Sequence, residues 1–183
     1  KAVIKANQIP YNYVTCKEAQ ELSTGLSTGG KTSSLMFGIQ WDLTCKFLEI
    51  KGGLTQAELK GGDGVGSTNW GNYNNSTILL SQGKYNTSPN SSSSQWLDII
   101  QGSKNGKMLL TTGASEDTKK MNIYDFAGNV YEWTLEKRID DNSPCAIRGG
   151  SYVYGGSGGA ASNRGYGSTS GNYDDIGFRP SLY

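Results

Sequence analysis

The chain has 183 residues, of which 35% are hydrophobic and 18% are charged, and its formal net charge is +1. This length suits one compact domain with a substantial core, so we expect a single domain over residues 1–183. The balanced charge argues against nucleic acid as a partner, and no apolar run is long enough for direct membrane insertion.

The pattern of the N-terminal third predicts one strand and two helices. Ala2–Ile4 fits a short strand, and Cys16–Ser23 has helical spacing with Thr15 as its N-cap. Leu35–Ile50 carries an apolar stripe at spacings of four and three, and Gly52 and Gly53 stop it. The stripe consists of Phe37, Trp41, Cys45 and Leu48.

The remainder predicts a long irregular segment followed by strands. Residues 52–94 are rich in Gly, Asn and Ser and predict mostly irregular structure. Alternating patterns then predict strands of an antiparallel sheet, which gives an α+β fold. The expected strands are Trp96–Ile100, Lys107–Thr111, Val130–Thr134, Ala146–Tyr154 and Ile176–Leu182.

The three cysteines, Cys16, Cys45 and Cys145, are widely spaced, and the chain has no histidine. This set excludes the common zinc sites. Buried free thiols are the simplest interpretation, because free cysteine packs as a small apolar group. A Cys16–Cys45 disulfide stays open as an alternative.

Three blocks resemble the formylglycine-generating-enzyme/sulfatase-modifying-factor family. They are the segment from Tyr124 to Trp133 (YDFAGNVYEW), the segment from Arg148 to Tyr152 (RGGSY), and Gly177-Phe-Arg179. The resemblance implies a C-type-lectin-like fold of the formylglycine-generating-enzyme type, with two helices flanking small antiparallel sheets and much irregular structure.

The chemistry of this family has no matching residues here. The family enzyme holds copper with a pair of cysteines soon after the R-G-G-S block, and no cysteine follows Ser151 in this chain. A related branch uses histidine-bound iron, and histidine is absent. Since both metals need soft or imidazole ligands, we expect no enzyme activity and no required cofactor.

The resemblance also implies a structural calcium site. Its ligands would be the side chain of Asp125, the carbonyls of Gly128 and Val130, and the side chain of Glu132, an all-oxygen set that suits a hard cation. In the alternative interpretation Asp125 caps a turn, and Glu132 pairs with Arg148 or Arg179.

Residues 155–175 contain seven Gly, four Ser and two Tyr but no large aliphatic residue, Phe, Trp or Pro. We therefore expect a surface excursion that forms no core, in which Tyr gives contact area and Ser, Gly and Asn give adaptable hydrogen bonds. The stretch resembles the diversified region of variable proteins of diversity-generating retroelements. Random replacement of adenines in AAY codons cannot yield Lys, Glu, Gln, Met or Trp, and none of these occurs in residues 152–175.

We expect this ligand-binding region, residues 152–175, to contact a cell-surface macromolecule, more readily a protein than a sugar. The candidate contact residues are Tyr152, Val153, Tyr154, Tyr166, Ser168, Tyr173, Asp174 and Asp175. Ala160–Arg164 resembles a fixed island, in which Arg164 holds the loop. The resemblance further implies a phage tail or a bacterial cell surface as the location, and a homo-oligomer, by analogy a trimer, as an option that raises avidity.

Three alternatives remain at the level of sequence. Residues 155–175 could be a flexible Gly/Ser linker. The chain could be an oxygenase of the formylglycine-generating type or its iron-using relative. It could also be a calcium-dependent carbohydrate lectin, although the Glu-Pro-Asn and Gln-Pro-Asp tripeptides of that group are absent.

Overall fold

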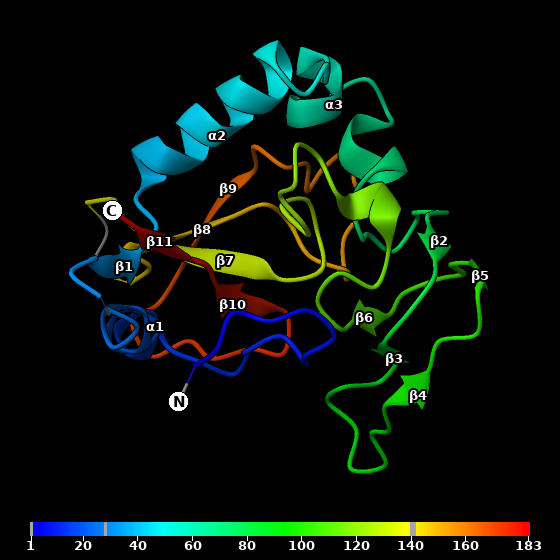
Figure 1. The fold of residues 1–183 in the computed structure, drawn as a ribbon, viewed down its shortest axis with the longest axis horizontal. Coiled ribbons are helices and arrows are strands. Elements are labelled where there is room, and N and C mark those ends of the chain that lie inside the picture. The colour runs from blue at the N-terminus through cyan, green and yellow to red at the C-terminus, as the bar shows by residue number, and fades with distance from the viewer. Residues whose placement is uncertain (1, 28, 140–141) are drawn as a thin grey trace.

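A computed structural model describes residues 2–27, 29–139 and 142–183 (Figure 1). The fold is α+β, with short helices, small sheets and much irregular chain, as the sequence predicts. The helices are α1 (Cys16–Thr24), α2 (Gly38–Ile50) and α3 (Gln56–Lys60), with 3-10 turns η1 (Gly66–Asn69) and η2 (Glu116–Thr118). The strands are β1 (Ser33–Leu35), β2 (Leu79–Leu80), β3 (Lys84–Asn86), β4 (Leu97–Asp98), β5 (Gly102–Ser103), β6 (Leu109–Leu110), β7 (Tyr131–Lys137), β8 (Cys145–Arg148), β9 (Arg164–Gly167), β10 (Ile176–Phe178) and β11 (Pro180–Leu182).

The central sheet has four strands in the order β10-β7-β8-β9. β8 pairs antiparallel with β7 and β9, but β10 pairs parallel with β7, which differs from the purely antiparallel sheet expected. The expected closing strand Ile176–Leu182 is in fact two strands, because β11 leaves this sheet and pairs with β1. The change of sheet occurs at Arg179, whose guanidinium binds Glu132.

The predicted helices are present with corrected bounds. Thr15 caps α1 as expected, in a capping box with Glu18. The expected helix Leu35–Ile50 begins only at Gly38, because the preceding residues form β1. The predicted strand Ala2–Ile4 is wrong, since these residues form no strand.

The Gly-rich segment 52–94 is less irregular than expected. It contains α3, η1, β2 and β3, which are all short. The neighbouring strands form a two-stranded sheet, β2-β5, and a three-stranded sheet, β4-β3-β6. Within the described ranges, no helix has the length and apolar character needed to cross a membrane.

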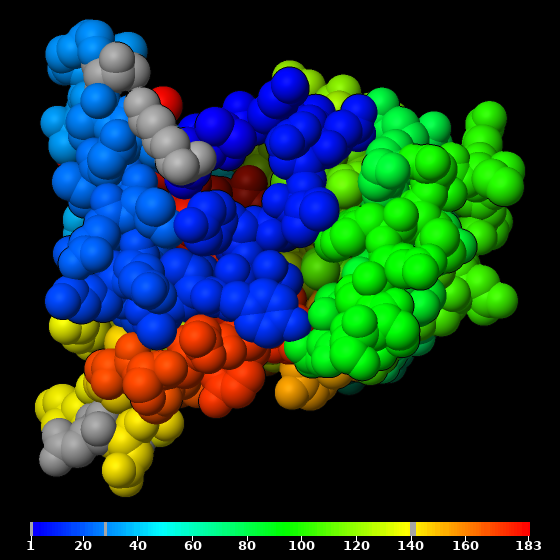
Figure 2. Space-filling view, turned by 90° about the horizontal axis from the view of Figure 1, so that it is seen from below, coloured from blue at the N-terminus to red at the C-terminus, as the bar shows by residue number. Residues whose placement is uncertain are grey.

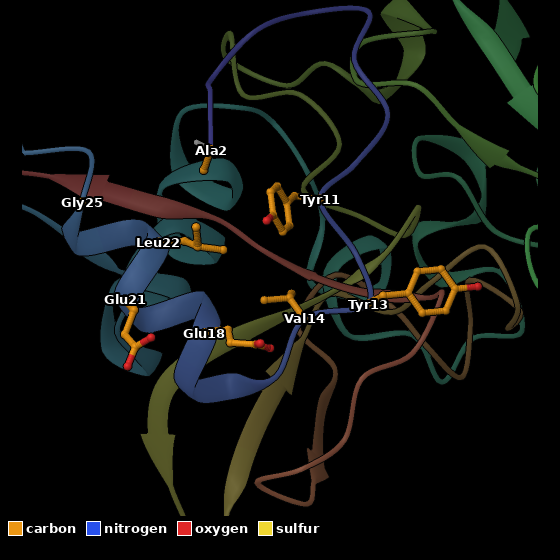
Figure 3. Close-up of a pocket in the computed structure, with 8 residues that line it drawn as sticks. All are labelled: Ala2, Tyr11, Tyr13, Val14, Glu18, Glu21, Leu22 and Gly25. Atoms are coloured by element: carbon orange, nitrogen blue, oxygen red, sulfur yellow. The ribbon is translucent and has the colours of Figure 1, made fainter.

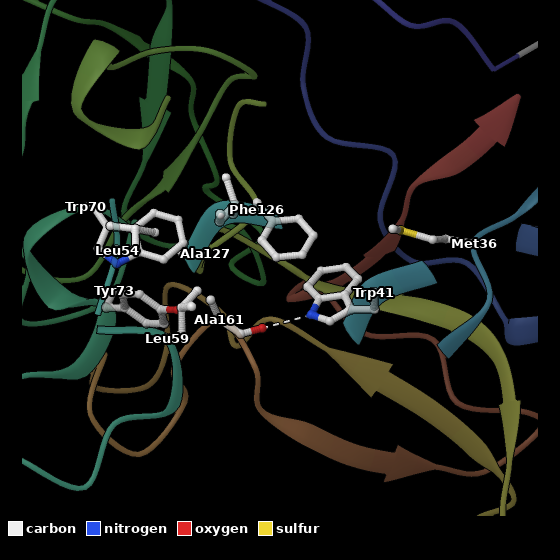
Figure 4. Packing of buried hydrophobic residues seen from close by; sticks show 10 residues of the cluster. Met36, Trp41, Leu54, Leu59, Trp70, Tyr73, Phe126, Ala127 and Ala161 are labelled. Atoms are coloured by element: carbon white, nitrogen blue, oxygen red, sulfur yellow. Dashed lines mark hydrogen bonds between the residues drawn. The ribbon is translucent and has the colours of Figure 1, made fainter. Parts of the chain in front are cut away.

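Two main clusters of buried side chains lie on opposite sides of the central sheet, one beneath α2 and α3 and one beneath α1 (Figure 1). In the first, Trp41 of α2 stacks on Phe126 with ring centroids 4.1 Å apart (Figure 4). The second contains Trp133 of β7, which is fully buried and donates a hydrogen bond to the carbonyl of Val14 (2.9 Å). The helices thus sandwich a sheet whose last strand, β9, belongs to the Gly/Ser-rich tail.

Lys104 is an unusual buried cation near β5. Only 3% of the residue is exposed, and its ammonium donates to the carbonyls of Tyr73 and Gly106 at 2.5 Å each. Burial lowers the pKa of this lysine to about 8. The ammonium is therefore stabilised by two backbone carbonyl oxygens.

Candidate functional site

Residues 152–175, named the variable loop after the expectation that they are diversified, connect β8 to β10 and are anchored by their main chain. The N–H of Asn74 donates to the carbonyl of Tyr154, and the N–H of Ser67 donates to the carbonyl of Gly156, both at 3.0 Å. Gly156 itself lies against Thr68, where a Cβ would come within 2.5 Å of the threonine Oγ1. These contacts hold the first part of the loop through its main chain and require glycine at position 156.

The middle of the variable loop forms core, which corrects the expectation that residues 155–175 stay outside it. Ala160 and Ala161 are 1% and 0% exposed. The carbonyl of Ala161 accepts a hydrogen bond from the indole of Trp41 at 2.9 Å (Figure 4). Alanine is small enough to enter this space, and the following residues, β9, pair with β8. The possible contact surface is therefore split into residues 153–158 and 168–175.

Arg164 holds the loop, as the sequence predicts. Its guanidinium binds Asp42 of α2 at 3.0 Å and Glu136 of β7 at 2.8 Å. Arg148, which faces Arg164 across the β8–β9 pair, binds the same two carboxylates. Arg148 and Arg164 would repel each other across the strand pair, but the two carboxylates shared between them offset this repulsion. The network fixes the loop to α2 and to the centre of the sheet.

Tyr152 is not a surface contact residue, which corrects its place among the candidates. The side chain is 1% exposed and packs with Leu109 and Val130. Its hydroxyl donates to the carboxylate of Asp174, and burial raises its pKa. The two ends of the variable loop are therefore joined by a buried tyrosine, which makes Tyr152 a framework residue.

Tyr154 and Tyr173 are the most exposed aromatic side chains of the loop, each at 52%. The ring of Tyr154 meets the ring of Tyr131 edge to face, with centroids 5.9 Å apart. Val153, next to Tyr154 on the chain, is half-buried, and so is Ser168. A half-exposed tyrosine offers the rigid apolar surface of its ring and a polar hydroxyl, which suits contact with a macromolecule.

The remaining candidates also serve the framework. Tyr166 of β9 is half-buried, and the guanidinium of Arg138 lies 4.3 Å from its ring centroid. The carboxylate of Asp175 accepts from the hydroxyl of Ser151 at 2.9 Å, and burial raises its pKa. Asp174 binds Tyr152 as described. Tyr166, Asp174 and Asp175 thus present only part of each side chain to solvent.

Sequence reasoning missed an N-terminal contribution to this surface. The N–H of Tyr13 donates to the carbonyl of Tyr173 at 3.0 Å, and the Tyr13 hydroxyl reaches Asn90. Figure 2 shows the end of the variable loop, in orange, beside the blue N-terminal segment. Tyr13 is 47% exposed and forms with Tyr173 a pair of half-exposed tyrosines, named here the tyrosine ridge. The spacing of Tyr11 and Tyr13 in an otherwise irregular segment was the available signal.

A cavity of about 390 Å³ opens beside this ridge, between the N-terminal segment and α1 (Figure 3). Tyr11 and Leu22 point toward it, whereas the ring of Tyr13 points away from α1. Glu18 lies at its edge but is committed to capping the helix. The cavity therefore adds a hollow next to the tyrosine ridge.

The residues expected to bind calcium have other partners. Both carboxylate oxygens of Glu132 accept hydrogen bonds from Arg179, at 2.8 and 2.9 Å. Those of Asp125 accept from the N–H of Gly113 and the hydroxyl of Thr118, at 2.8 Å each. The side chains thus follow the alternative interpretation, and the set does not fit a calcium cage.

The turn that holds Gly128 and Val130, the residues expected to supply carbonyl ligands, already contains a cationic side chain. The guanidinium of Arg179 donates to the carbonyls of Tyr124 and Asp125 at 3.2 Å each, so a fixed cation already lies at this turn. In the described part of the chain, no cluster of three or more His, Cys, Asp or Glu side chains could hold a metal. Gly128 instead adopts a φ of 73° and bridges to Asn72.

The three cysteines are free thiols in the structure. Cys16 and Cys145 pack in the cluster beneath α1, whereas Cys45 packs against the other cluster. The Cys16–Cys45 disulfide is therefore wrong, because the two thiols belong to different clusters. Burial raises the pKa of Cys16 to about 12 and that of Cys45 to about 11, so neither is poised as a thiolate ligand.

Comparison with protein families matches residues 7–181, nearly the whole chain, to the Sulfatase-modifying factor enzyme 1-like domain. Comparison with curated proteins and with solved structures finds no significant match. The family match agrees with the three blocks at residues 124–133, 148–152 and 177–179, which meet in the central sheet and its flanking turns.

Proposed function

The chain belongs to the sulfatase-modifying-factor family, and we propose that within it this protein is a non-catalytic binding protein with a hypervariable surface. Its variable loop is diversified by a retroelement and contacts a cell-surface macromolecule, in the first instance a protein. The location is a phage tail or a bacterial cell surface. By analogy with other such proteins, a homo-oligomer would raise avidity.

One observation carries this proposal: the variable loop is fixed by contacts that do not involve the side-chain hydroxyls of Tyr154 and Tyr173. The anchors are main-chain hydrogen bonds to Asn74 and Ser67, the buried pair Ala160–Ala161, and the ion pairs of Arg164. A loop held in this way can exchange exposed residues such as Tyr154 without losing its path. A flexible Gly/Ser linker would lack these anchors.

The choice of exposed residues supports a binding role. Tyr154, Tyr173 and the adjoining Tyr13 are each about half exposed. Tyrosine gives a large contact area at a small cost in conformational entropy, and it is enriched in binding loops and at interface hot spots. The hydroxyls of Tyr154 and Tyr173 can also bond to a partner, whereas that of Tyr13 is bonded to Asn90.

The neighbouring DNA provides the first test. We expect a reverse-transcriptase gene and a near-copy of the 3′ coding region that differs from it at adenines, with differences confined to codons 152–175. Absence of both from the neighbourhood would refute the retroelement part of the proposal. Differences concentrated at Ala160–Arg164 would contradict the division between framework and contact residues.

Binding to cells provides the second test. Labelled protein is compared with a Tyr154→Ala, Tyr173→Ala double variant on a panel of bacterial strains. We expect the variant to lose binding by tenfold or more, on the order of an interface hot spot, and to keep the unfolding midpoint of the parent chain. The matched control is Tyr124→Ala, which removes a tyrosine that hydrogen-bonds Glu116 away from the loop.

The family also contains enzymes, so oxidase activity is the alternative function. The chain has no histidine, and its three thiols are distributed between two buried clusters. We therefore expect no turnover of a cysteine-bearing peptide when copper or iron is added. Measured turnover that disappears in a Cys45→Ser variant would replace the binding proposal with an enzymatic one.

A further inference from the structure

The outer face of α2 carries an apolar stripe that no other part of the described chain covers. Ile39, Leu43, Phe47 and Ile50 are 65%, 61%, 42% and 62% exposed. Their spacings of four, four and three residues place them on one side of the helix. The opposite side holds Trp41, which is fully buried in the core.

A helix that is apolar on both sides is expected to be buried on both. The four exposed side chains leave roughly 400 Å² of contiguous apolar surface, at the size where surface patches on monomers usually have a binding role. Each partner of a typical stable interface buries about 800 Å². The stripe supplies about half of that area, and the polar residues on its margins can supply the rest.

We propose that this stripe is the interface of a two-fold homodimer, in which α2 packs against α2 of a second copy. In an antiparallel arrangement, Ile39 of one copy lies against Ile50 of the other, and Leu43 lies against Phe47. The stripe is thus complementary to itself, as an isologous interface requires. The spacing of four between Ile39, Leu43 and Phe47 forms the ridge that commonly packs between helices.

The charges beside the stripe do not oppose this arrangement. Lys46 and Glu49 neutralise each other at 3.0 Å within one copy. Asp42 is bound by both Arg148 and Arg164. A second copy therefore meets no cluster of uncompensated like charges along α2, which would otherwise weaken a symmetric contact.

The dimer would leave the end of the variable loop, around Tyr173, free. In Figure 1, α2 lies along the top of the molecule, and Figure 2, which views the molecule from below, shows the end of the variable loop on the opposite face. The ends of the two loops in a dimer would thus lie on the faces away from its interface. This inference does not depend on the proposed function, because it concerns a different face of the molecule.

The test is the molar mass of the purified chain, measured by sedimentation velocity over a wide concentration range. We expect a species of twice the 19.7 kDa monomer, with a dissociation constant that rises by at least about tenfold in Leu43→Glu. The matched control is Leu79→Glu. Leu79 is 59% exposed, close to the value for Leu43, but it lies on β2, away from α2 (Figure 1).

Circular dichroism of Leu43→Glu checks that the fold is retained, and Phe47→Glu provides a second variant if it is not. A monomer at all concentrations would overturn the inference. So would a dimer or trimer that survives both substitutions, or one that Leu79→Glu disrupts equally. Loss of binding to cells by the loop variants leaves this interface unaffected, so the two proposals fail separately.

Discussion

The division of the variable loop into framework and contact residues predicts sharply different costs for three tyrosine-to-alanine substitutions. Tyr152 is 1% exposed, packs with Leu109 and Val130, and hydrogen-bonds Asp174. Its replacement by Ala removes a buried aromatic ring and leaves a cavity, which costs about 3–5 kcal/mol. Tyr154 and Tyr173 are half exposed, so the same change should cost about 1 kcal/mol or less.

Urea unfolding followed by tryptophan fluorescence measures these costs. The midpoint should fall strongly for Tyr152→Ala and hardly at all for Tyr154→Ala and Tyr173→Ala, with a similar slope for all three. Tyr152→Phe separates the ring from the hydroxyl, and we expect it to retain most of the stability. Equal losses for Tyr152→Ala and Tyr154→Ala would refute the reasoning, because Tyr154 would then be part of the framework.

Three further predictions concern the scaffold. Gly167→Ala should destabilise the fold by about 1–3 kcal/mol in the same unfolding assay, because the new Cβ would come within 2.6 Å of the buried Trp133 ring. Arg179→Met should lower the free energy of unfolding by about 3–5 kcal/mol at neutral pH, because Glu132 is left buried without a partner. The loss should be smaller at acid pH, where Glu132 can take up a proton. An equal loss at both pH values would contradict the ion pair. Burial holds the pKa of Lys104 at about 8, below its ordinary 10.5, so between these values the unfolded chain binds more protons. The stability of the parent chain should therefore rise relative to Lys104→Met, by roughly 1–2 kcal/mol from pH 8 to 10, and a constant difference would show that the ammonium is hydrated.

Local signals predicted the helices well. Thr15 and Glu18 form the capping box that starts α1, and both are visible in the sequence. The same signal, Thr55 followed by Glu58, starts α3, but the surrounding glycines led us to expect irregular chain there. A helix cap is a contact within one turn, so it can be recognised in the sequence without knowledge of the fold.

Long-range pairing could not be predicted in the same way. Leu35 was expected to begin a helix, yet it ends strand β1 because Pro180 lies beside it. The parallel pairing of β10 with β7 likewise depends on where the chain returns after the variable loop. An alternating pattern identifies a strand but says nothing of the direction of its neighbour.

The site was predicted in part for a similar reason. Composition marked residues 152–175 as a binding loop, and the island around Arg164 was identified correctly. Composition treats all tyrosines in the loop alike, however, so it could not separate buried Tyr152 from exposed Tyr154. It also could not reveal that Tyr13, far away in the chain, lies beside Tyr173.

The main-chain bonds from Asn74 and Ser67 have a consequence for evolution. A peptide N–H donates equally well to the carbonyl of any residue, so the bond from Asn74 does not depend on the side chain at position 154, whereas the bond from Ser67 needs glycine at position 156. Chains that differ only at the exposed positions around Tyr154 and Tyr173 should therefore share one folding pathway and melt within a narrow range. Variants that bind different partners could then arise without a corresponding increase in variants that misfold.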